Sequence, residues 1–390
     1  MKAKLLFMLM ILLATFLPVS VNAAEPADTA FSVEDTLKNI DMDSLEEFKG
    51  SIEGELSSYL ETKSVKEWLM DFVKGDWNFD LKEILQNIVR FFFKEILANS
   101  GLLSKLIILS VLSALLINLH NAFSSSIAKL SYLVCFLALC ALALGSFRTV
   151  LLIGQNTIDN MTTFMTAMLP QMMVLVAGLG NINASVMLFP ILMTAATALA
   201  NGIKTIVFPL IIFSAVLSLV NQMSETIKVE RMAKLLAQLA QLCLGFFVTI
   251  FVGIVTLRAL YASVLDKVAL RTTRYITDNA VPLVGKMVGD TIEVAAGYVV
   301  MLKQALGIYG VFIILGIIIF PLLKIAAIVI IYRVVAAVVE PMGDSKTAAV
   351  LETMGNHLMM MLAATASVGV MFFFMIAIVA GMSNGLSMLR

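Results

Sequence analysis

Apolar runs long enough to cross a lipid bilayer fill most of the chain after residue 100. A transmembrane helix needs about 20 predominantly apolar residues, because the hydrocarbon core is about 30 Å thick. Because the run at 304–339 is too long for one crossing, it is interpreted as two helices divided at Pro321. The sequence therefore predicts an all-α, polytopic integral membrane protein with about eight transmembrane helices. The apolar runs cover residues 102–119, 130–147, 184–201, 205–221, 237–257, 304–320, 321–339 and 358–381.

Composition and charge support this class. The 390 residues are 60% hydrophobic and 14% charged, whereas soluble domains average about 45–50% apolar and about 25% charged residues. Residues 25–99 contain 17 acidic and 8 basic side chains, and residues 100–390 contain 10 acidic and 17 basic ones. This asymmetry indicates two environments. Since all three cysteines lie in apolar runs, the acidic segment has no disulfide framework.

The first 24 residues have the pattern of a secretory signal peptide. Two lysines precede an apolar stretch at 5–17, and small residues follow a proline. Cleavage is expected after Ala23 or Ala24, which places the next segment outside the cytoplasm. Residues 25–98 then predict a small, acidic, helical extracytoplasmic domain, because hydroxyl–carboxylate capping patterns recur there and its last helix is amphipathic. This domain is interpreted either as a helical spacer or as a docking surface.

An internal repeat organises the remainder. After a two-helix segment at 99–150, residues 160–257 resemble residues 272–381. Two pairs of prolines share one spacing, and the sequences Ile-Val-Phe-Pro-Leu and Ile-Ile-Phe-Pro-Leu surround the second pair. Each copy is predicted to contain three spans, and an odd number inverts the second copy. Inverted 3+3 repeats with interrupted helices are typical of transporters. The candidate helix breaks are Pro170 and Pro282 in the first pair, and Pro209 and Pro321 in the second.

The arrangement of basic residues favours this count of spans. If 161–180 lies outside the spans, the predicted inner loops carry nine basic residues and the outer loops four, as the positive-inside rule requires. If that segment crosses the bilayer, the basic stretch at 258–303 moves outside, which is unfavourable.

Several charged residues are candidates for function. Lys324 and Arg333 lie within one apolar run, and such residues usually anchor helix ends by snorkelling or face a polar pathway. Both interpretations remain open. Glu230 and Glu352 lie in matching amphipathic linkers. These linkers are explained either as helices on the membrane surface or as partner-docking sites.

Sequence patterns of catalysis are missing. The two histidines, His120 and His357, are far apart in the sequence, whereas a zinc site takes at least three protein ligands. No phosphate-binding loop of the Walker type is present. We expect no enzymatic activity, no cofactor and no nucleic-acid partner. Energy for transport must then come from a partner or a gradient.

The order of these features resembles the stage III sporulation protein AE family of endospore-forming bacteria. The resemblance covers essentially the whole chain and rests on the signal peptide, the acidic segment, the two early spans and the repeated Phe-Pro-Leu and Glu-x-Met motifs. It implies a non-enzymatic membrane core of a channel or secretion complex between mother cell and forespore. The implied partners are ring-forming membrane proteins and an ATPase, and the implied location is the mother-cell membrane around the forespore. An autonomous secondary transporter for a small solute is the alternative.

Overall fold

The computed structural model describes nearly all of the chain after residue 81. The described residues are 66–67, 69–70, 81–123, 126–178, 182–223, 228–280 and 284–381. The predicted signal peptide with its cleavage at Ala23 or Ala24, most of the predicted domain at 25–98, and Pro282 lie outside these ranges.

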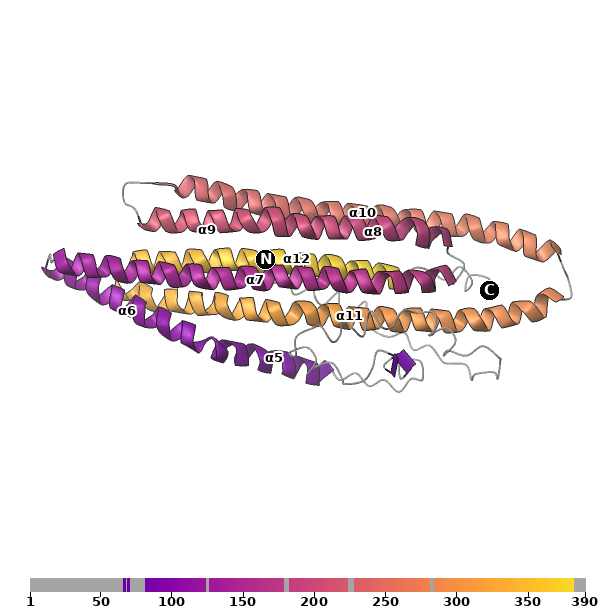
Figure 1. Ribbon diagram of the computed structural model, residues 1–390, viewed down its shortest axis with the longest axis horizontal. Coiled ribbons are helices and arrows are strands. Elements are labelled where there is room, and N and C mark those ends of the chain that lie inside the picture. Colours follow the sequence, from indigo (N-terminus) through magenta and orange to yellow (C-terminus); the bar gives the residue numbers. More distant parts are fainter. Residues whose placement is uncertain are drawn as a thin grey trace.

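Helices form the described chain and lie side by side in one elongated bundle (Figure 1). A 5-residue π-helix, η1, connects α8 to α9, and a 3-residue 3₁₀-helix, η2, precedes α12. The elements are α5 (Leu81–Ala98), α6 (Ser100–Phe123), α7 (Ser126–Gly178), α8 (Ile182–Gly202), η1 (Ile203–Val207), α9 (Phe208–Met223), α10 (Glu230–Ala280), α11 (Val284–Val339), η2 (Glu340–Met342) and α12 (Ser345–Gly381).

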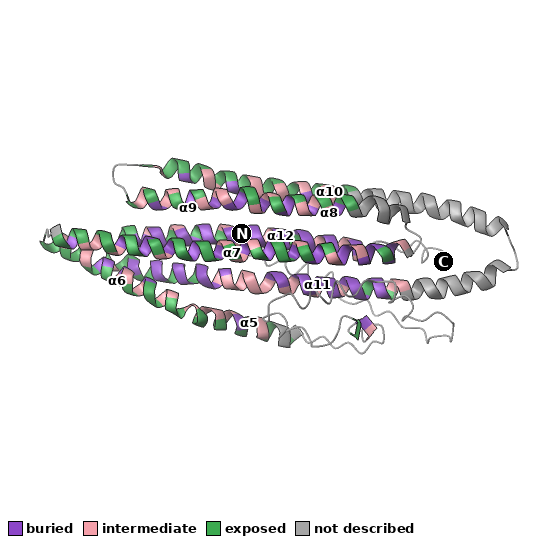
Figure 2. Cartoon of the chain, in the orientation of Figure 1, coloured by how far each residue is buried: buried purple, intermediate pink, exposed green. Residues whose placement is uncertain are grey.

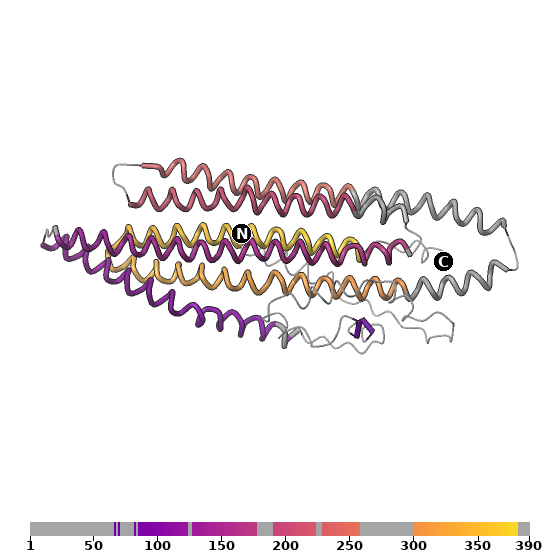
Figure 3. Tube along the Cα trace, viewed as in Figure 1, coloured from indigo at the N-terminus to yellow at the C-terminus, as the bar shows by residue number. Residues whose placement is uncertain are grey.

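Six helical stretches of the described chain are long and apolar enough to cross a membrane, which confirms the class of polytopic membrane protein. Six candidate spans are found where about eight are predicted, because two pairs of predicted spans each form one continuous helical path. The predicted spans 184–201 and 205–221 form one uninterrupted helical path through η1 (Figure 3). The apolar run at 304–339 is likewise one helix with Pro321 inside it. A proline removes one backbone hydrogen bond, and surrounding helices in a bundle tolerate that loss without a reversal of the chain.

The two halves of the sequence repeat form two long helical hairpins. The path α8–η1–α9 turns back as α10, and α11 turns back as α12 (Figure 1). Each copy therefore contributes two long helices where three spans are predicted. Since an even number returns the chain to its starting side, the two copies run in the same direction and the predicted inversion does not arise. Residues 161–178 of the predicted lead-in belong to α7, which also contains the predicted span 130–147.

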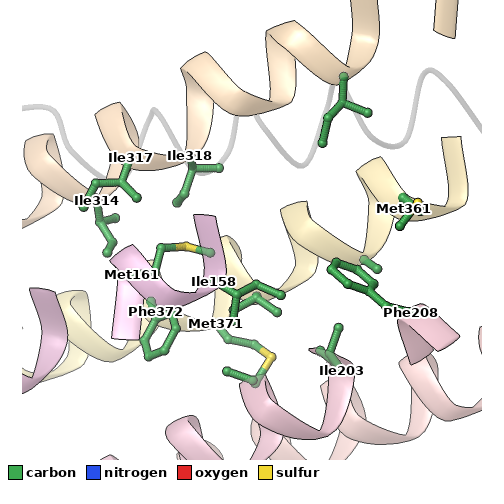
Figure 4. Packing of buried hydrophobic residues seen from close by; sticks show 14 of the residues in the cluster. Ile158, Met161, Ile203, Phe208, Ile314, Ile317, Ile318, Met361, Met371 and Phe372 are labelled. Carbon is green, nitrogen blue, oxygen red and sulfur yellow. The ribbon is translucent and has the colours of Figure 1, made fainter. Parts of the chain in front are cut away.

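The core runs along the bundle axis between α7, α11 and α12. Buried positions form long stripes on these three helices (Figure 2). Figure 4 shows Ile158 and Met161 of α7 packed near Ile314 of α11 and Phe372 of α12. Lipid chains are as apolar as these side chains, so van der Waals packing is what holds such helices together.

Close approach of α11 and α12 depends on a glycine. A β-carbon at Gly369 would lie 2.7 Å from Ile318 Cδ1, which is closer than two carbon atoms approach without movement. Small residues at helix interfaces in membranes allow this proximity. Gly245 on α10, by contrast, has no neighbouring atom within 4 Å of such a carbon.

We expect Gly369→Leu to destabilise the bundle by about 1–3 kcal/mol, the usual cost of overpacking a filled core. Gly245→Leu is the matched control and should leave stability unchanged or slightly raised, because leucine favours the helix more than glycine. Size-exclusion chromatography of the detergent-solubilised protein after heating compares the two variants. Equal melting of both variants would show that the α11–α12 contact is loosely packed.

Candidate functional site

Polar contacts join helices in the described part of the bundle, and a first group of them centres on Asp344. This residue is buried and lies between η2 and α12. Its Oδ2 accepts hydrogen bonds from Ser113 Oγ at 2.7 Å and from Thr347 Oγ1 at 2.5 Å. Its Oδ1 accepts from the Thr347 amide at 3.0 Å and from Tyr132 Oη at 3.2 Å. One carboxylate thus links α6, α7 and α12.

Local sequence explains how Asp344 reaches this position. An aspartate immediately before a helix caps the free amides of its first turn, and Asp344 does so for the Thr347 amide. The turn before it needs Gly343, whose φ of 89° falls in the left-handed region that glycine adopts without strain. Asn118 of α6 donates to the Met342 carbonyl at 2.8 Å and fixes this turn against α6.

The second group joins the two hairpins. His357 of α12 and Ser214 of α9 are both buried, and Nε2 lies 2.8 Å from Oγ. Ser214 Oγ donates its one proton to the Ala233 carbonyl of α10 at 2.7 Å. His357 Nδ1 lies 2.8 Å from the carbonyl oxygen of Thr353 in its own helix, an atom that can only accept, so Nδ1 carries a proton.

The Ser214–His357 pair raises the question of a nucleophile with its base, which the sequence analysis does not anticipate. In a catalytic pair a third polar group orients the histidine and the serine hydroxyl is open to substrate. Here the orienting atom is a backbone carbonyl of the same helix, and the buried hydroxyl also donates to Ala233. These contacts favour a polar clamp between α9, α10 and α12.

The third group is an ion pair between α7 and η1. Lys204 Nζ lies 2.6 Å from both carboxylate oxygens of Asp159. Asp159 is about half exposed, and Lys204 is more covered. π-Helical turns inside longer helices occur frequently at functional sites. The wider turn at Ile203–Val207 ends just before Pro209, the residue whose missing amide would interrupt a regular helix.

Lys324 and Arg333, the candidates for a polar pathway, both lie on α11. Lys324 is half-buried. Arg333 is exposed and donates from Nη2 to Asn356 Oδ1 of α12 at 3.3 Å. This contact places Arg333 at the α11–α12 surface. Both interpretations of the two residues stay predictions.

The remaining candidate residues lie near helix starts, on an exposed helix surface or inside long helices. Glu230 is the first residue of α10 and pairs with Lys234 one turn later, while Glu352 is exposed on α12. Pro170 lies inside α7 and Pro321 inside α11, and both helices continue through them. Pro209 is the second residue of α9.

Metal binding finds no support in the described part of the chain, where no group of three or more His, Cys, Asp or Glu side chains is placed to hold an ion.

Asp344, Ser214 and the Asp159–Lys204 pair are not among the candidate residues predicted from the sequence. A signal for the first exists in the sequence Asp344-Ser-Lys-Thr347, which matches a helix N-cap pattern between two apolar runs. The Asp159–Lys204 and Ser214–His357 contacts join residues 45 and 143 positions apart, and no local sequence pattern predicts them.

Comparison with known proteins identifies the family. Residues 63–383 match the family described as Stage III sporulation protein AE, a range that includes every described helix. The chain belongs to this family. The Stage III sporulation protein AE of Bacillus subtilis (strain 168) is 32% identical over 374 residues, which are 95% of this chain and 94% of that protein. No solved structure matches the chain. The resemblance inferred from the sequence is confirmed, and all three polar groups lie within the stretch shared by the stage III sporulation protein AE family.

Proposed function

We propose that the protein is a non-enzymatic membrane core component of a sporulation channel or secretion complex that links mother cell and forespore and is needed for late forespore development. Membership of the stage III sporulation protein AE family over residues 63–383 carries this proposal. The helices of the bundle are packed together and joined by hydrogen bonds between polar side chains. Such a bundle is suited to a component that holds a complex together in the membrane.

The proposed partners would supply energy from nucleotide hydrolysis and a passage beyond the bilayer. Its sequence contains no Walker-type loop, so an ATPase has to provide energy from nucleotide hydrolysis if the complex uses it. Ring-forming membrane proteins would extend the passage beyond the bilayer. In this proposal the chain resides in the mother-cell membrane around the forespore, with its N-terminal domain extracytoplasmic.

Genetic complementation tests the sporulation role. A strain of Bacillus subtilis that lacks its own stage III sporulation protein AE should regain heat-resistant spores when it expresses this chain. A matched strain that expresses the Asp344→Ala variant should form far fewer of them. If the chain reaches the membrane at normal abundance and restores no spores, the proposed role in late forespore development is contradicted for this protein.

A docking role for Glu352 has a separate expected outcome. Glu352 is exposed on α12, so Glu352→Lys should leave the fold intact and weaken recovery of partners by at least threefold. Ser345→Lys, at another exposed position near the start of α12, is the control and should recover partners normally. Quantitative mass spectrometry after purification from sporulating cells measures both. Unchanged recovery with Glu352→Lys would remove this residue from the docking surface.

The alternative of an autonomous transporter loses its main support. It depends on an inverted repeat with a binding site between the copies, whereas the two hairpins here run in the same direction (Figure 1).

A further inference from the structure

The longest helices exceed the thickness of a bilayer about twofold. Helices α7, α10 and α11 have 53, 51 and 56 residues. At about 1.5 Å per residue each is roughly 75–85 Å long, whereas a bilayer with its headgroups is about 40–45 Å thick. Tilts of up to about 40° do not remove this difference. A large part of the bundle must therefore stand outside the hydrocarbon.

One half of the bundle exposes an apolar belt suited to lipid. On α7 the exposed large side chains from Leu130 to Leu144 are all apolar, with the exposed Lys129 just before them, and α6 and α9 expose similar apolar side chains. This half contains the last residues of α6, α9 and α11 and the first residues of α7, α10 and α12 (Figure 1). The exposed side chains of the belt include Ile108, Leu112, Leu115 and Leu119 of α6, Leu130, Leu133 and Leu137 of α7, and Phe213 and Val216 of α9; in the same half α10 exposes Leu235, Leu239 and Leu242 together with Gln238 and Gln241.

The exposed face of α7 changes character after Leu144. From position 145 to 166 it contains Gly145, Arg148, Thr149, Leu152, Asn156, Asp159, Asn160, Thr163 and Thr166. These positions recur at helical spacing and form one stripe in which only Leu152 is a large apolar residue. The neighbouring helix contributes exposed Thr194 and Asn201 of α8 and Thr205 of η1.

Lipid is a poor solvent for this stripe. Several of its threonines bond to carbonyls of their own helix, as Thr166 does to Thr162, and such hydroxyls are tolerated in hydrocarbon. Carboxamide and charged groups are not tolerated in hydrocarbon, because it offers them no hydrogen-bond partner. Asn156, Asn160 and Asn201 are exposed around the Asp159–Lys204 pair. This level of the bundle therefore contacts water or headgroups.

Contacts between helices place α5 at the same level. Gly154 packs on Thr365, and Gly369, one turn further along α12, packs on Ile318 of α11. The Phe91 ring of α5 meets the Phe320 ring at a centroid distance of 4.8 Å. Helix α5 runs nearly along the bundle axis and leads into α6 (Figure 1), so Phe91 reaches this level from the side on which α5 begins.

We propose that the bilayer surrounds only the half of the bundle with the apolar belt, that its surface lies near the Asp159–Lys204 pair and Phe91 of α5, and that the other half projects into water. The projecting half contains residues 160–178 of α7, most of α8 and the ends of α11 and α12 remote from η2. It lies on the side on which α5 begins, because α6 follows α5 into the bilayer. This inference does not depend on a role in sporulation.

Cysteine labelling in intact protoplasts tests the proposal. Single cysteines are introduced at Thr163, Val174 and Ile191 in the proposed projection, and at Leu137, Phe213 and Leu239 in the half with the belt, after replacement of Cys135, Cys140 and Cys243 by alanine. All six positions are exposed in the bundle. A membrane-impermeant maleimide applied outside should label the first three at least tenfold more than the last three. Labelling in denaturing detergent confirms that each thiol is present.

Val174 and Ile191 make the test decisive, because they are apolar yet lie in the proposed projection. Labelling of Thr163 alone would indicate a narrow water-filled pathway through helices embedded in lipid, and this result would overturn the proposal. Protection of all six cysteines would overturn it as well. The experiment needs no sporulating cell, so its outcome is independent of the proposed function.

Discussion

The Asp344→Ala variant is expected to lose about 3 kcal/mol of stability, because it removes a helix N-cap and several hydrogen bonds to a buried carboxylate. Ser113 and Tyr132 would lose their acceptor, and contact between α6, α7 and α12 would loosen at that end. Reversible unfolding by sodium dodecyl sulfate in mixed micelles measures the difference. Sporulation should fall in parallel, since the loosened bundle would be degraded.

Two variants sharpen this prediction. Asp344→Asn keeps an oxygen acceptor for the Thr347 amide and should cost less than the alanine variant. Glu340→Ala removes an exposed carboxylate nearby and should change stability by less than about 0.5 kcal/mol. If Asp344→Ala and Glu340→Ala unfold alike, the contacts of Asp344 do not stabilise the bundle.

The clamp between the hairpins should behave as one unit in a double-mutant cycle. We expect Ser214→Ala and His357→Ala each to cost about 1–3 kcal/mol, because the first leaves the buried His357 Nε2 without its Ser214 partner and the second removes a buried side chain together with that contact. The double variant should cost less than the sum by at least about 0.5 kcal/mol. The same unfolding assay applies to all three proteins.

Ser367→Ala is the control for that cycle. Ser367 is on α12, and its hydroxyl bonds only to the Ala363 carbonyl of the same helix. Its replacement should have little effect. Strict additivity of Ser214→Ala and His357→Ala would mean that the 2.8 Å approach contributes no coupling between α9 and α12.

The membrane class and helical content follow from sequence because long apolar runs have no other stable solution in lipid. The number of crossings does not follow as directly. Phe-Pro-Leu around Pro209 and Pro321 predicts helix ends, yet a proline inside a bundle loses one hydrogen bond and the helix can continue. In α8–α9 the π-helix at Ile203–Val207 preserves the path. An apolar sequence alone does not distinguish one long helix from two short ones.

The polar groups show a similar limit. Asp344 carries a local capping signal, whereas its partner Ser113 lies 231 positions earlier. Lys204 stands out as a charge between two apolar runs, but only the packing of α7 against η1 identifies Asp159 as its counter-ion. Long-range pairs of this kind depend on the register of the helices, which periodicity within each helix does not specify.

The most direct test of the proposed function is purification of the tagged chain from membranes of sporulating cells in mild detergent, followed by mass spectrometry. We expect ring-forming membrane proteins and a cytoplasmic ATPase to co-purify with it, and neither to co-purify with an unrelated membrane protein carrying the same tag. Recovery of the chain alone, as a monodisperse species at normal abundance, would contradict its role as the core of a complex.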